Sequence, residues 1–504
     1  MPERLQKLSF VEKAGYSLGD CAANFVFQAL IIFQLQFYTD TFGLAAAVAG
    51  TLLLVGRLWD AFFDPMMGAI ADRTNTRWGK FRPWVLWTAV PWGVVMFLAY
   101  TTPHFGGTGK LIYACVTNVL LMTLYSANNT PYSALTGVMT GDVNERTSLS
   151  TYRFVAALFA GLLVGGFTLP LVAKFGHGDS AKGWQMTMGL WAIVCVVFFL
   201  ITFATVRERI QPDPRQKSSA KRDFGDLLKN GPWIAMFLFT LVHLMAVAMR
   251  GGTMAYYFKY NVNQDRLFAF LKSWGLTAPA DGSNPGGVWH SLLNTFGLII
   301  DPQRTNVSQV GFSLLNMSSQ FVTIVGIMCA TWLAIRFGKK AVVIAGFAGA
   351  LIFMALFMVV RTDAIWTIFA VDWARAVCYA PTIPLVWAMF ADVVDYSEWI
   401  TGRRATGLIF AAIVFGLKAG LSLGGAIAGW LLSAFGYQAN VQQTDHALWG
   451  IRLIVSVIPA GLFLVCLICV VCYKITKKMN LQIQDELAER RKQYAALPAA
   501  SGVS

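Results

Sequence analysis

The chain has 504 residues, of which 56% are hydrophobic and 13% charged, and its formal net charge is +14. Soluble domains carry about a quarter charged residues, so this composition excludes a soluble globular protein and predicts an integral membrane protein. The apolar runs are too long and too continuous for the alternating strands of a membrane β-barrel.

Twelve apolar runs of about the length that crosses a bilayer, roughly 20 residues, predict an all-α membrane protein with twelve transmembrane helices. In chain order they cover residues 15–38, 45–71, 82–102, 110–140, 151–173, 185–206, 232–257, 309–336, 341–360, 365–391, 405–434 and 449–473. Lysine and arginine concentrate in alternate connecting loops, which is the pattern of cytoplasmic loops. We therefore expect a multi-pass protein of the cell inner membrane with both termini in the cytoplasm, surrounded by lipid and without a nucleic-acid partner.

The run order predicts two six-helix halves. A charged, proline-containing segment, 207–231, separates an N-terminal bundle (1–206) from a C-terminal bundle (232–473), and a cytoplasmic tail follows (474–504). The halves echo one another, because an aspartate-valine pair closes the fourth and the tenth run. A parallel repeat of six helices joined by a cytoplasmic linker is the design of the major facilitator fold, whose substrate site lies between the halves.

One segment, about 258–308, breaks the symmetry as a long excursion on the outer side. Loops of this length are usually functional or disordered. Its apolar clusters predict short helices at the outer mouth, acting either as a lid or as a packing insert.

The second run carries two acidic residues, Asp60 and Asp64, one helical turn apart. Ionisable groups are costly in hydrocarbon, so this pair needs a partner or a purpose. Spacing of four residues places both carboxylates on one face, within reach of one shared cation or proton. The alternative is a buried ion pair between Arg57 and Asp60, which leaves Asp64 unaccompanied. Lys418, alone in the eleventh run, must find a carboxylate elsewhere in the bundle.

Polar residues in the first and fourth runs are candidates to bind a substrate. Residues 125–133 supply consecutive amides and hydroxyls, including Asn129, before a proline that frees backbone carbonyls. Such a patch suits hydroxyl-rich ligands such as sugars, although hydrogen bonding between helices would also use it. Asp20 and Asn24 share a face of the first run, where Asp20 is either solvated or functional and Asn24 lies deeper.

Further polar residues occur in the seventh and tenth runs. Asp372 and Arg375 form a pair that can neutralise itself, while Trp373 and Tyr379 can stack on a sugar ring. Arg250 could bind an anionic group such as a uronate or sulfonate, or anchor the helix at the interface.

The loop after the second run contains an acid followed by clustered bases: Asp72, Arg73, Arg77 and Lys80. Membrane topology alone accounts for their charge. They can also act as a conformational latch that holds helix ends together in one state and releases them in another.

Two motifs, RLWDAFFDPMMG at 57–68 and RWGKFRPW at 77–84, closely resemble the glycoside–pentoside–hexuronide:cation symporters of the major facilitator superfamily, which include the melibiose permease. The segment ADVVDYSE at 391–398 also fits. The resemblance implies uptake of a glycoside coupled to Na⁺, Li⁺ or H⁺. It implies that Asp60 and Asp64 are cation ligands assisted by Ser126, that Lys418 links the cation and sugar sites, and that Arg153 lies near the sugar.

The sequence departs from the melibiose permease at the positions that grip the sugar. Two carboxylates become Asn24 and Asn129, an aromatic residue becomes Ser133, and polar residues become Ile413 and Val414. Neutral amides bind hydroxyls more weakly than carboxylates. The resemblance therefore implies another glycoside, an oligosaccharide or a uronide, with Asp20, Asp372 or Arg250 filling the gap.

We interpret the chain as a secondary-active sugar symporter that works by alternating access, without a cofactor and as a monomer. The alternatives are a cation-coupled or facilitated transporter of a lipid-like or anionic solute, and a non-transporting sensor on the same fold. No triad, phosphate loop or metal-ligand spacing predicts an enzyme.

Overall fold

The computed structural model describes residues 7–140, 143–209, 230–278, 288–401 and 406–496. Within these ranges the chain is helical, with two isolated β-bridges. The helices of the first half are α1 (Phe10–Ile32), α2 (Gln34–Gln36), the π-helix η2 (Phe37–Thr41), α3 (Ala46–Arg73), α4 (Arg82–Ala99), α5 (Gly107–Met139), α6 (Val143–Gly176) and α7 (Ser180–Thr205).

The second half begins with α9 (Gly231–Tyr256), the π-helix η3 (Tyr257–Asn261), α10 (Gln264–Ser273) and α11 (Val288–Thr295). It continues with α12 (Val307–Met328), α13 (Ala330–Phe337), α14 (Lys339–Leu356), α15 (Ile365–Tyr379), α16 (Thr382–Thr401), α17 (Thr406–Ala434), α18 (Asp445–Val455), α19 (Val457–Cys472) and α20 (Lys477–Ala496). Most of the predicted linker, residues 210–229, lies outside the described residues, as do 497–504 of the predicted tail.

The predicted all-α membrane fold is confirmed. Among the described residues, ten helical segments are long and apolar enough to cross a membrane, and the bent pair Phe10–Ile32 and Gln34–Thr41, with a 55° angle, makes an eleventh. Helix α4, with 18 residues, occupies the third predicted run. These elements together are consistent with twelve crossings.

Some predicted runs are interrupted. The run at 365–391 is divided between α15 and α16, because Pro381 has no backbone N–H to continue the helix. The run at 309–336 is divided between α12 and α13 at Cys329, and the last run is divided between α18 and α19 at Ser456.

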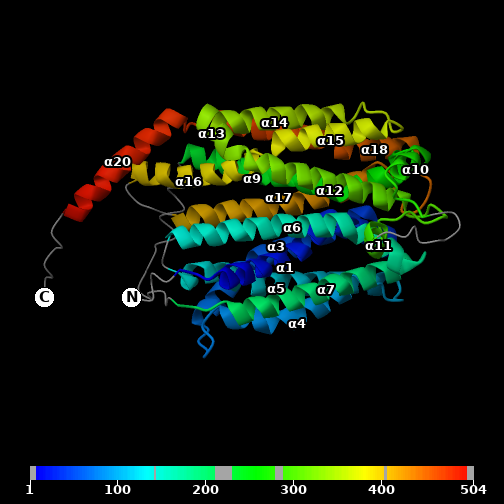
Figure 1. The fold of residues 1–504 in the computed structure, drawn as a ribbon, viewed down its shortest axis with the longest axis horizontal. Coiled ribbons are helices and arrows are strands. Elements are labelled where there is room, and N and C mark those ends of the chain that lie inside the picture. Colours follow the sequence, from blue (N-terminus) through cyan, green and yellow to red (C-terminus); the bar gives the residue numbers. More distant parts are fainter. Residues whose placement is uncertain (1–6, 141–142, 210–229, 279–287, 402–405, 497–504) are drawn as a thin grey trace.

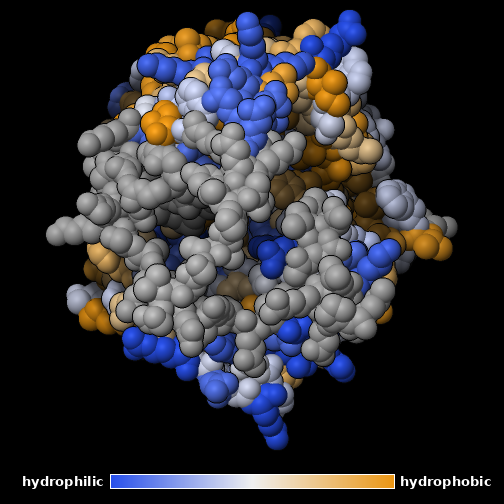
Figure 2. All heavy atoms as spheres, turned by 90° about the vertical axis from the view of Figure 1, so that its left-hand side faces the viewer, coloured by the Kyte–Doolittle hydropathy of each residue, from blue (hydrophilic) through white to orange (hydrophobic). Residues whose placement is uncertain are grey.

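The long helices lie roughly side by side in one bundle (Figure 1). Helix α20 lies at one end, where α1 also begins, and α10 lies at the other; we call these the α20 end and the α10 end. The start of α1 is fixed by a capping box, in which Ser9 and Glu12 satisfy each other's backbone N–H groups. Figure 2 views the α20 end, where hydrophilic residues gather toward the edges of the face.

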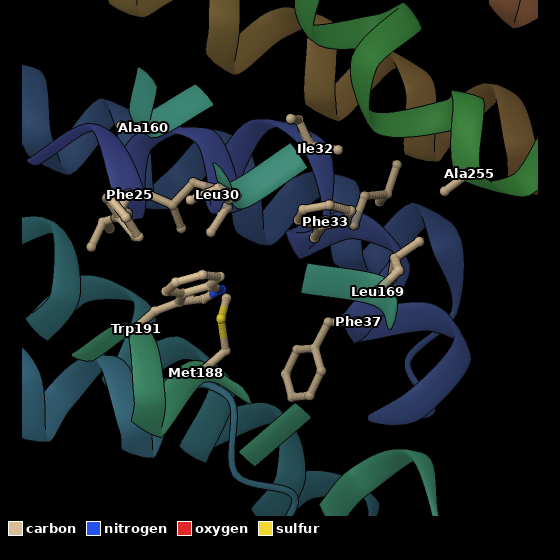
Figure 3. Close-up of a cluster of buried hydrophobic side chains, with 14 of the residues drawn as sticks. Phe25, Leu30, Ile32, Phe33, Phe37, Ala160, Leu169, Met188, Trp191 and Ala255 are labelled. Carbon is tan, nitrogen blue, oxygen red and sulfur yellow. The ribbon is translucent and has the colours of Figure 1, made fainter. Parts of the chain in front are cut away.

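The hydrophobic core differs between the two ends. One buried cluster joins the N-terminal helices to the parts of α9, α12, α15, α17 and α18 near the α10 end. A second cluster lies within the C-terminal half, between α9, α14, α16, α17 and α19. In the first cluster, Phe25 of α1 packs against Trp191 of α7 at 5.0 Å between ring centroids, and Ala255 of α9 belongs to the same cluster on the side of Ile32 (Figure 3). The halves therefore share their core near the α10 end.

The predicted outer insert contains two short helices, α10 and α11. The rings of Phe270 and Trp366 lie 4.9 Å apart, which fixes α10 to α15. The chain after α11 reaches the N-terminal half, because Phe296 stacks on Phe167 of α6 at 4.5 Å. The insert thus contacts both halves, while residues 279–287 lie outside the described part.

Candidate functional site

Two carboxylates of α3 meet two hydroxyls of α5 inside the bundle. The Asp60 side chain is 0% exposed and that of Asp64 is 26% exposed. The Ser126 hydroxyl lies 2.5 Å from Asp60 Oδ1 and 2.6 Å from Asp64 Oδ1, and the Thr130 hydroxyl donates to Asp64 Oδ1 at 3.2 Å. Both pairs are spaced by four residues, so each shares one helix face. The result is a cluster of oxygen atoms, the ligands that hard cations prefer.

The described donors of this cluster do not give every carboxylate oxygen an aligned hydrogen bond. A serine hydroxyl carries one proton, so Ser126 can donate to only one of its two carboxylate neighbours at a time. Asp60 Oδ2 is buried, and the Lys418 ammonium lies 2.8 Å from it as an ion pair without the alignment of a hydrogen bond. An added proton or a small cation would satisfy these oxygens.

Lys418 of α17 brings a positive charge to the cluster from the other half. Its ammonium lies 2.8 Å from Asp60 Oδ2 and also pairs with Asp64 Oδ2. One ammonium faces two carboxylates, so these three side chains together keep one excess negative charge when all are ionised.

Glycines of α17 set the position of Lys418. A Cβ at Gly420 would lie 2.2 Å from the Leu241 carbonyl oxygen, and one at Gly424 would lie 2.3 Å from that of Met245. Only glycine permits this approach of α17 to α9. On the opposite side, a Cβ at Gly429 would overlap the Ala46 carbonyl oxygen of α3 at 2.5 Å.

Arg57 lies on α3 one turn before Asp60, and its exposure is 8%. Its guanidinium lies 5.6 Å from the centre of the Phe27 ring and has no ion pair or hydrogen bond with the described residues. The alternative pair between Arg57 and Asp60 is therefore not formed in this structure. Arg57 instead borders a small cavity of about 20 Å³ between the halves, with Gln34 and Ser422.

The predicted substrate residues of the N-terminal half form a separate group. Arg153 of α6 pairs with Asp20 of α1 at 2.9 Å, and its guanidinium lies over the rings of Tyr16 and Tyr132. The Asn24 amide donates to the Asp20 backbone carbonyl at 2.8 Å. In α5, the Asn129 amide donates to the Tyr125 hydroxyl at 3.4 Å.

A cavity of about 340 Å³ lies between the halves. Gln28 and Leu158 line it from α1 and α6, whereas the other lining residues come from the C-terminal half. Asp372 pairs there with Arg250 at 2.7 Å and with Arg375 at 2.9 Å. Two guanidiniums face one carboxylate, so this group of three carries an excess positive charge.

The structure distributes the other predicted C-terminal residues around this cavity. Tyr379 lines it, and its hydroxyl lies 2.8 Å from His243 Nε2. The Trp373 indole instead donates to the Ser318 hydroxyl at 2.9 Å. Arg250 also donates to the Val455 carbonyl and lies over Phe357, so both of its terminal nitrogens make contacts within the protein.

The sequence reasoning treated Arg375 only as the partner of Asp372. Arg375 lines the cavity and its side chain is 19% exposed, while Nε and Nη2 contact Asp372 at 2.9 and 3.4 Å. A neighbouring Gln320 and Asn316 add amides to the same wall. The signal available in the sequence was a guanidinium in the middle of an apolar run, which is expensive unless it has a role.

A group of polar residues joins the halves at the α10 end. Asp40 of η2 pairs with Lys259 of η3 at 2.6 Å and also accepts a hydrogen bond from Tyr437. Thr39 and Tyr256 share a hydrogen bond of 2.7 Å beside them. Burial raises the pKa of Tyr437 well above its usual value, so its hydroxyl stays protonated and able to donate. The first helix of each half therefore ends in a π-helical turn, and these two turns meet.

The loop that carries the predicted latch residues Asp72, Arg73, Arg77 and Lys80 is held by another residue, Glu208. Glu208 accepts the backbone N–H groups of Lys80, Phe81 and Arg82 at 2.9, 2.7 and 2.8 Å, which caps the start of α4. The side chain of Arg77 stacks on Trp78 at 4.7 Å. No ion pair involving the side chains of the four predicted residues is formed among the described residues.

Ion pairs described near the α20 end lie within one half. Lys13 pairs with Glu145 at 2.9 Å in the N-terminal half, and Lys339 pairs with Asp392 in the C-terminal half. Pairs across the halves occur at Asp40 and at the Asp60–Asp64–Lys418 cluster. Among the described residues, the ion pairs that join the two halves therefore lie away from the α20 end.

The sequence matches the family described as MFS/sugar transport protein over residues 15–280 and 303–477. The chain belongs to this family. It is 34% identical over 491 residues to the inner membrane symporter YicJ of Escherichia coli (strain K12), covering 96% of each chain. It is 31% identical to the isoprimeverose transporter of Lactiplantibacillus pentosus, covering 95% of this chain and 92% of that one.

The fold is similar to that of solved transporters. A bacterial homologue of the human peptide transporters PepT1 and PepT2 superposes with a TM-score of 0.62 and 11% identity, covering 95% of this chain and 99% of that one. At this identity the likeness concerns the fold alone, and it agrees with the predicted fold. The match to the family and to the two relatives above indicates a membrane transporter rather than an enzyme.

Proposed function

We propose that this protein imports a sugar or glycoside together with a cation, Na⁺, Li⁺ or H⁺, by alternating access. The observation that carries the proposal is the contact of Lys418 with both Asp60 and Asp64, beside the hydroxyls of Ser126 and Thr130. The names of the two relatives, a symporter and an isoprimeverose transporter, support symport of a sugar.

The coupling cation binds where the ammonium of Lys418 now lies. A cation entering between the two carboxylates competes with Lys418 for Asp60 Oδ2 and Asp64 Oδ2. Since Lys418 belongs to the other half, its displacement changes the attraction between the halves, and this links cation binding to the rocking motion.

The sugar binds in the cavity of about 340 Å³ between the halves. Tyr379 and Arg375 contact it from the C-terminal half, and Asp372 holds Arg375 in place. Asp20, Asn24, Asn129 and Arg153 extend the site into the N-terminal half as alternating access exposes them. Arg57 tunes the cation site electrostatically from one turn away.

The membrane orientation follows from charge. We infer that the α20 end is cytoplasmic, because Arg73, Lys80, Lys339 and Lys477 gather there, and that the protein lies in the inner membrane. The structure then represents a state closed to the outside. Residues 1–206 and 232–473 form the two moving bundles, joined by 207–231, and the insert at 258–308 packs over the outer mouth.

The experiment is uptake into proteoliposomes of a panel of labelled glucosides, xylosides, galactosides and glucuronides, with imposed Na⁺, Li⁺ or pH gradients. Symport predicts that at least one sugar accumulates only with a cation gradient. Sugar counterflow without any cation dependence would contradict coupling, and no transport of any sugar with transport of a lipid-like solute would favour the alternative substrate class.

A further inference from the structure

A cleft of about 400 Å³ lies at the α20 end, remote from the sites described above. The turn between α13 and α14 forms one wall, where Gly338 has a φ of 88°. The segment 473–477 and the start of α20 form the other. The cleft therefore opens between the α13–α14 turn and the polar terminal helix α20.

Three lysines line this cleft, and only one of them is neutralised by a carboxylate there. Lys339 pairs with Asp392. Lys340 instead donates to the carbonyls of Val471 and Tyr473 at 3.0 and 2.6 Å, and Lys477 donates to that of Ile335 at 2.9 Å. These carbonyl contacts hold the two ammonium groups at the rim while leaving their charges uncompensated.

The start of α14 adds donors to the same rim. Its N-cap residue, Gly338, has no side chain to cap the helix, and Gly338 and the first three residues of α14, 339–341, line the cleft. An uncapped helix N-terminus also carries partial positive charge. Together with the lysines, this arrangement favours a phosphate.

The remaining walls of the cleft are apolar. Ile344 and Ile475 line its interior, while Phe337 and Leu481 are exposed by 58% and 56% at its edge. A free phosphate ion gains nothing from contact with apolar walls, whereas an acyl chain is stabilised by burying its surface against them. The combination of cationic rim and apolar walls matches an amphiphile with an anionic head.

We propose that this cleft binds an anionic phospholipid, with the phosphate at Lys340 and Lys477 and an acyl chain along Phe337 and Leu481. The bound lipid would fasten the start of α20 to the α13–α14 turn. The proposal does not depend on the transport function, because it concerns lipid binding to the resting protein.

The test is native mass spectrometry of the purified full-length protein with phosphatidylglycerol or phosphatidylcholine of the same acyl chains. We expect phosphatidylglycerol to bind about thirtyfold more tightly, which corresponds to roughly 2 kcal/mol, because two basic residues attract its anionic headgroup. The double variant K340Q/K477Q should lose this preference, and K340R/K477R should keep it, which guards against a mere folding defect.

The matched control is K474Q/K478Q, which removes the same charge from two exposed lysines that do not line the cleft. It should leave the preference unchanged. Equal loss in the control would show only a diffuse basic surface and would overturn the proposal. Displacement of the lipid by excess inorganic phosphate would also overturn it, by identifying a free-anion site, as would the absence of any lipid preference in the unmodified protein.

Discussion

Two buried charge clusters of the bundle are opposite in composition. At Asp60 and Asp64, two carboxylates share one ammonium from Lys418. At Asp372, one carboxylate holds the two guanidiniums of Arg250 and Arg375. Buried charges normally pair to neutrality, because each unpaired charge is costly. The acid-rich cluster and the base-rich cluster therefore each have an incomplete set of partners. Each is suited to a different ligand.

The connections of the two clusters also differ. The acidic cluster spans the halves, since α3 carries the acids and α17 the base. The basic cluster lies within the C-terminal half and faces the cavity between the halves. A ligand of the first cluster can change how the halves attract one another, whereas a ligand of the second mainly gains a binding surface.

The largest expected effect is at the acidic cluster. The substitution Asp64→Asn removes a ligand and leaves Lys418 with one partner, so gradient-driven uptake should fall roughly 100-fold, as for the loss of about 3 kcal/mol at a buried pair. Uptake into proteoliposomes measures this. The matched control is Asp179→Asn, since Asp179 caps α7 and asparagine caps equally well. Equal uptake by the two variants would show that Asp64 takes no part in coupled transport.

The second effect separates coupling from binding. Lys418→Gln removes the link between the halves, so gradient-driven uptake should fall about tenfold while exchange of sugar at equal cation concentration persists, because a link of roughly 1.4 kcal/mol is lost. Parallel uptake and counterflow assays measure the two rates. A proportional loss of both would mean that Lys418 serves stability or sugar binding instead.

The third effect tests the basic cluster. Arg375→Gln should weaken sugar binding about tenfold, the loss expected for a hydrogen bond to a charged group, and leave the cation affinity unchanged. Calorimetry with sugar and with cation gives both values. Arg375→Lys keeps the charge but not the paired N–H donors of the guanidinium, so its sugar affinity should lie between those of the unmodified protein and Arg375→Gln. A change in cation affinity equal to that in sugar affinity would contradict the separation of the two clusters.

The smallest effect is at the closure of the α10 end. Asp40→Asn weakens the partly exposed pair with Lys259 by about 1 kcal/mol, so amide exchange in 257–261 should rise roughly fivefold. Hydrogen exchange followed by mass spectrometry measures this. Unchanged exchange would mean that the aromatic packing of Tyr256 and Tyr437 at 5.2 Å is sufficient to hold the ends together.

The sequence predicted the fold and the residues of the acidic cluster, because charges inside apolar runs are visible without a structure. It also predicted that Lys418 needs a distant carboxylate. It did not predict Glu208 as a helix cap, nor the pair between Asp40 and Lys259, which are 219 residues apart. Charges at helix ends look solvated in a sequence, and only packing reveals which of them meet. Thr130 was hidden among other polar residues of the same patch.

The central claim is that a coupling cation and Lys418 compete for Asp60 and Asp64. The most direct measurement is calorimetric titration of the purified protein and of the variants Lys418→Gln and Asp64→Asn with Na⁺, Li⁺ and acid, without sugar. The account predicts that one of these cations binds the unmodified protein, binds Lys418→Gln more tightly because its competitor is gone, and fails to bind Asp64→Asn. Equal cation affinity in all three proteins would contradict it.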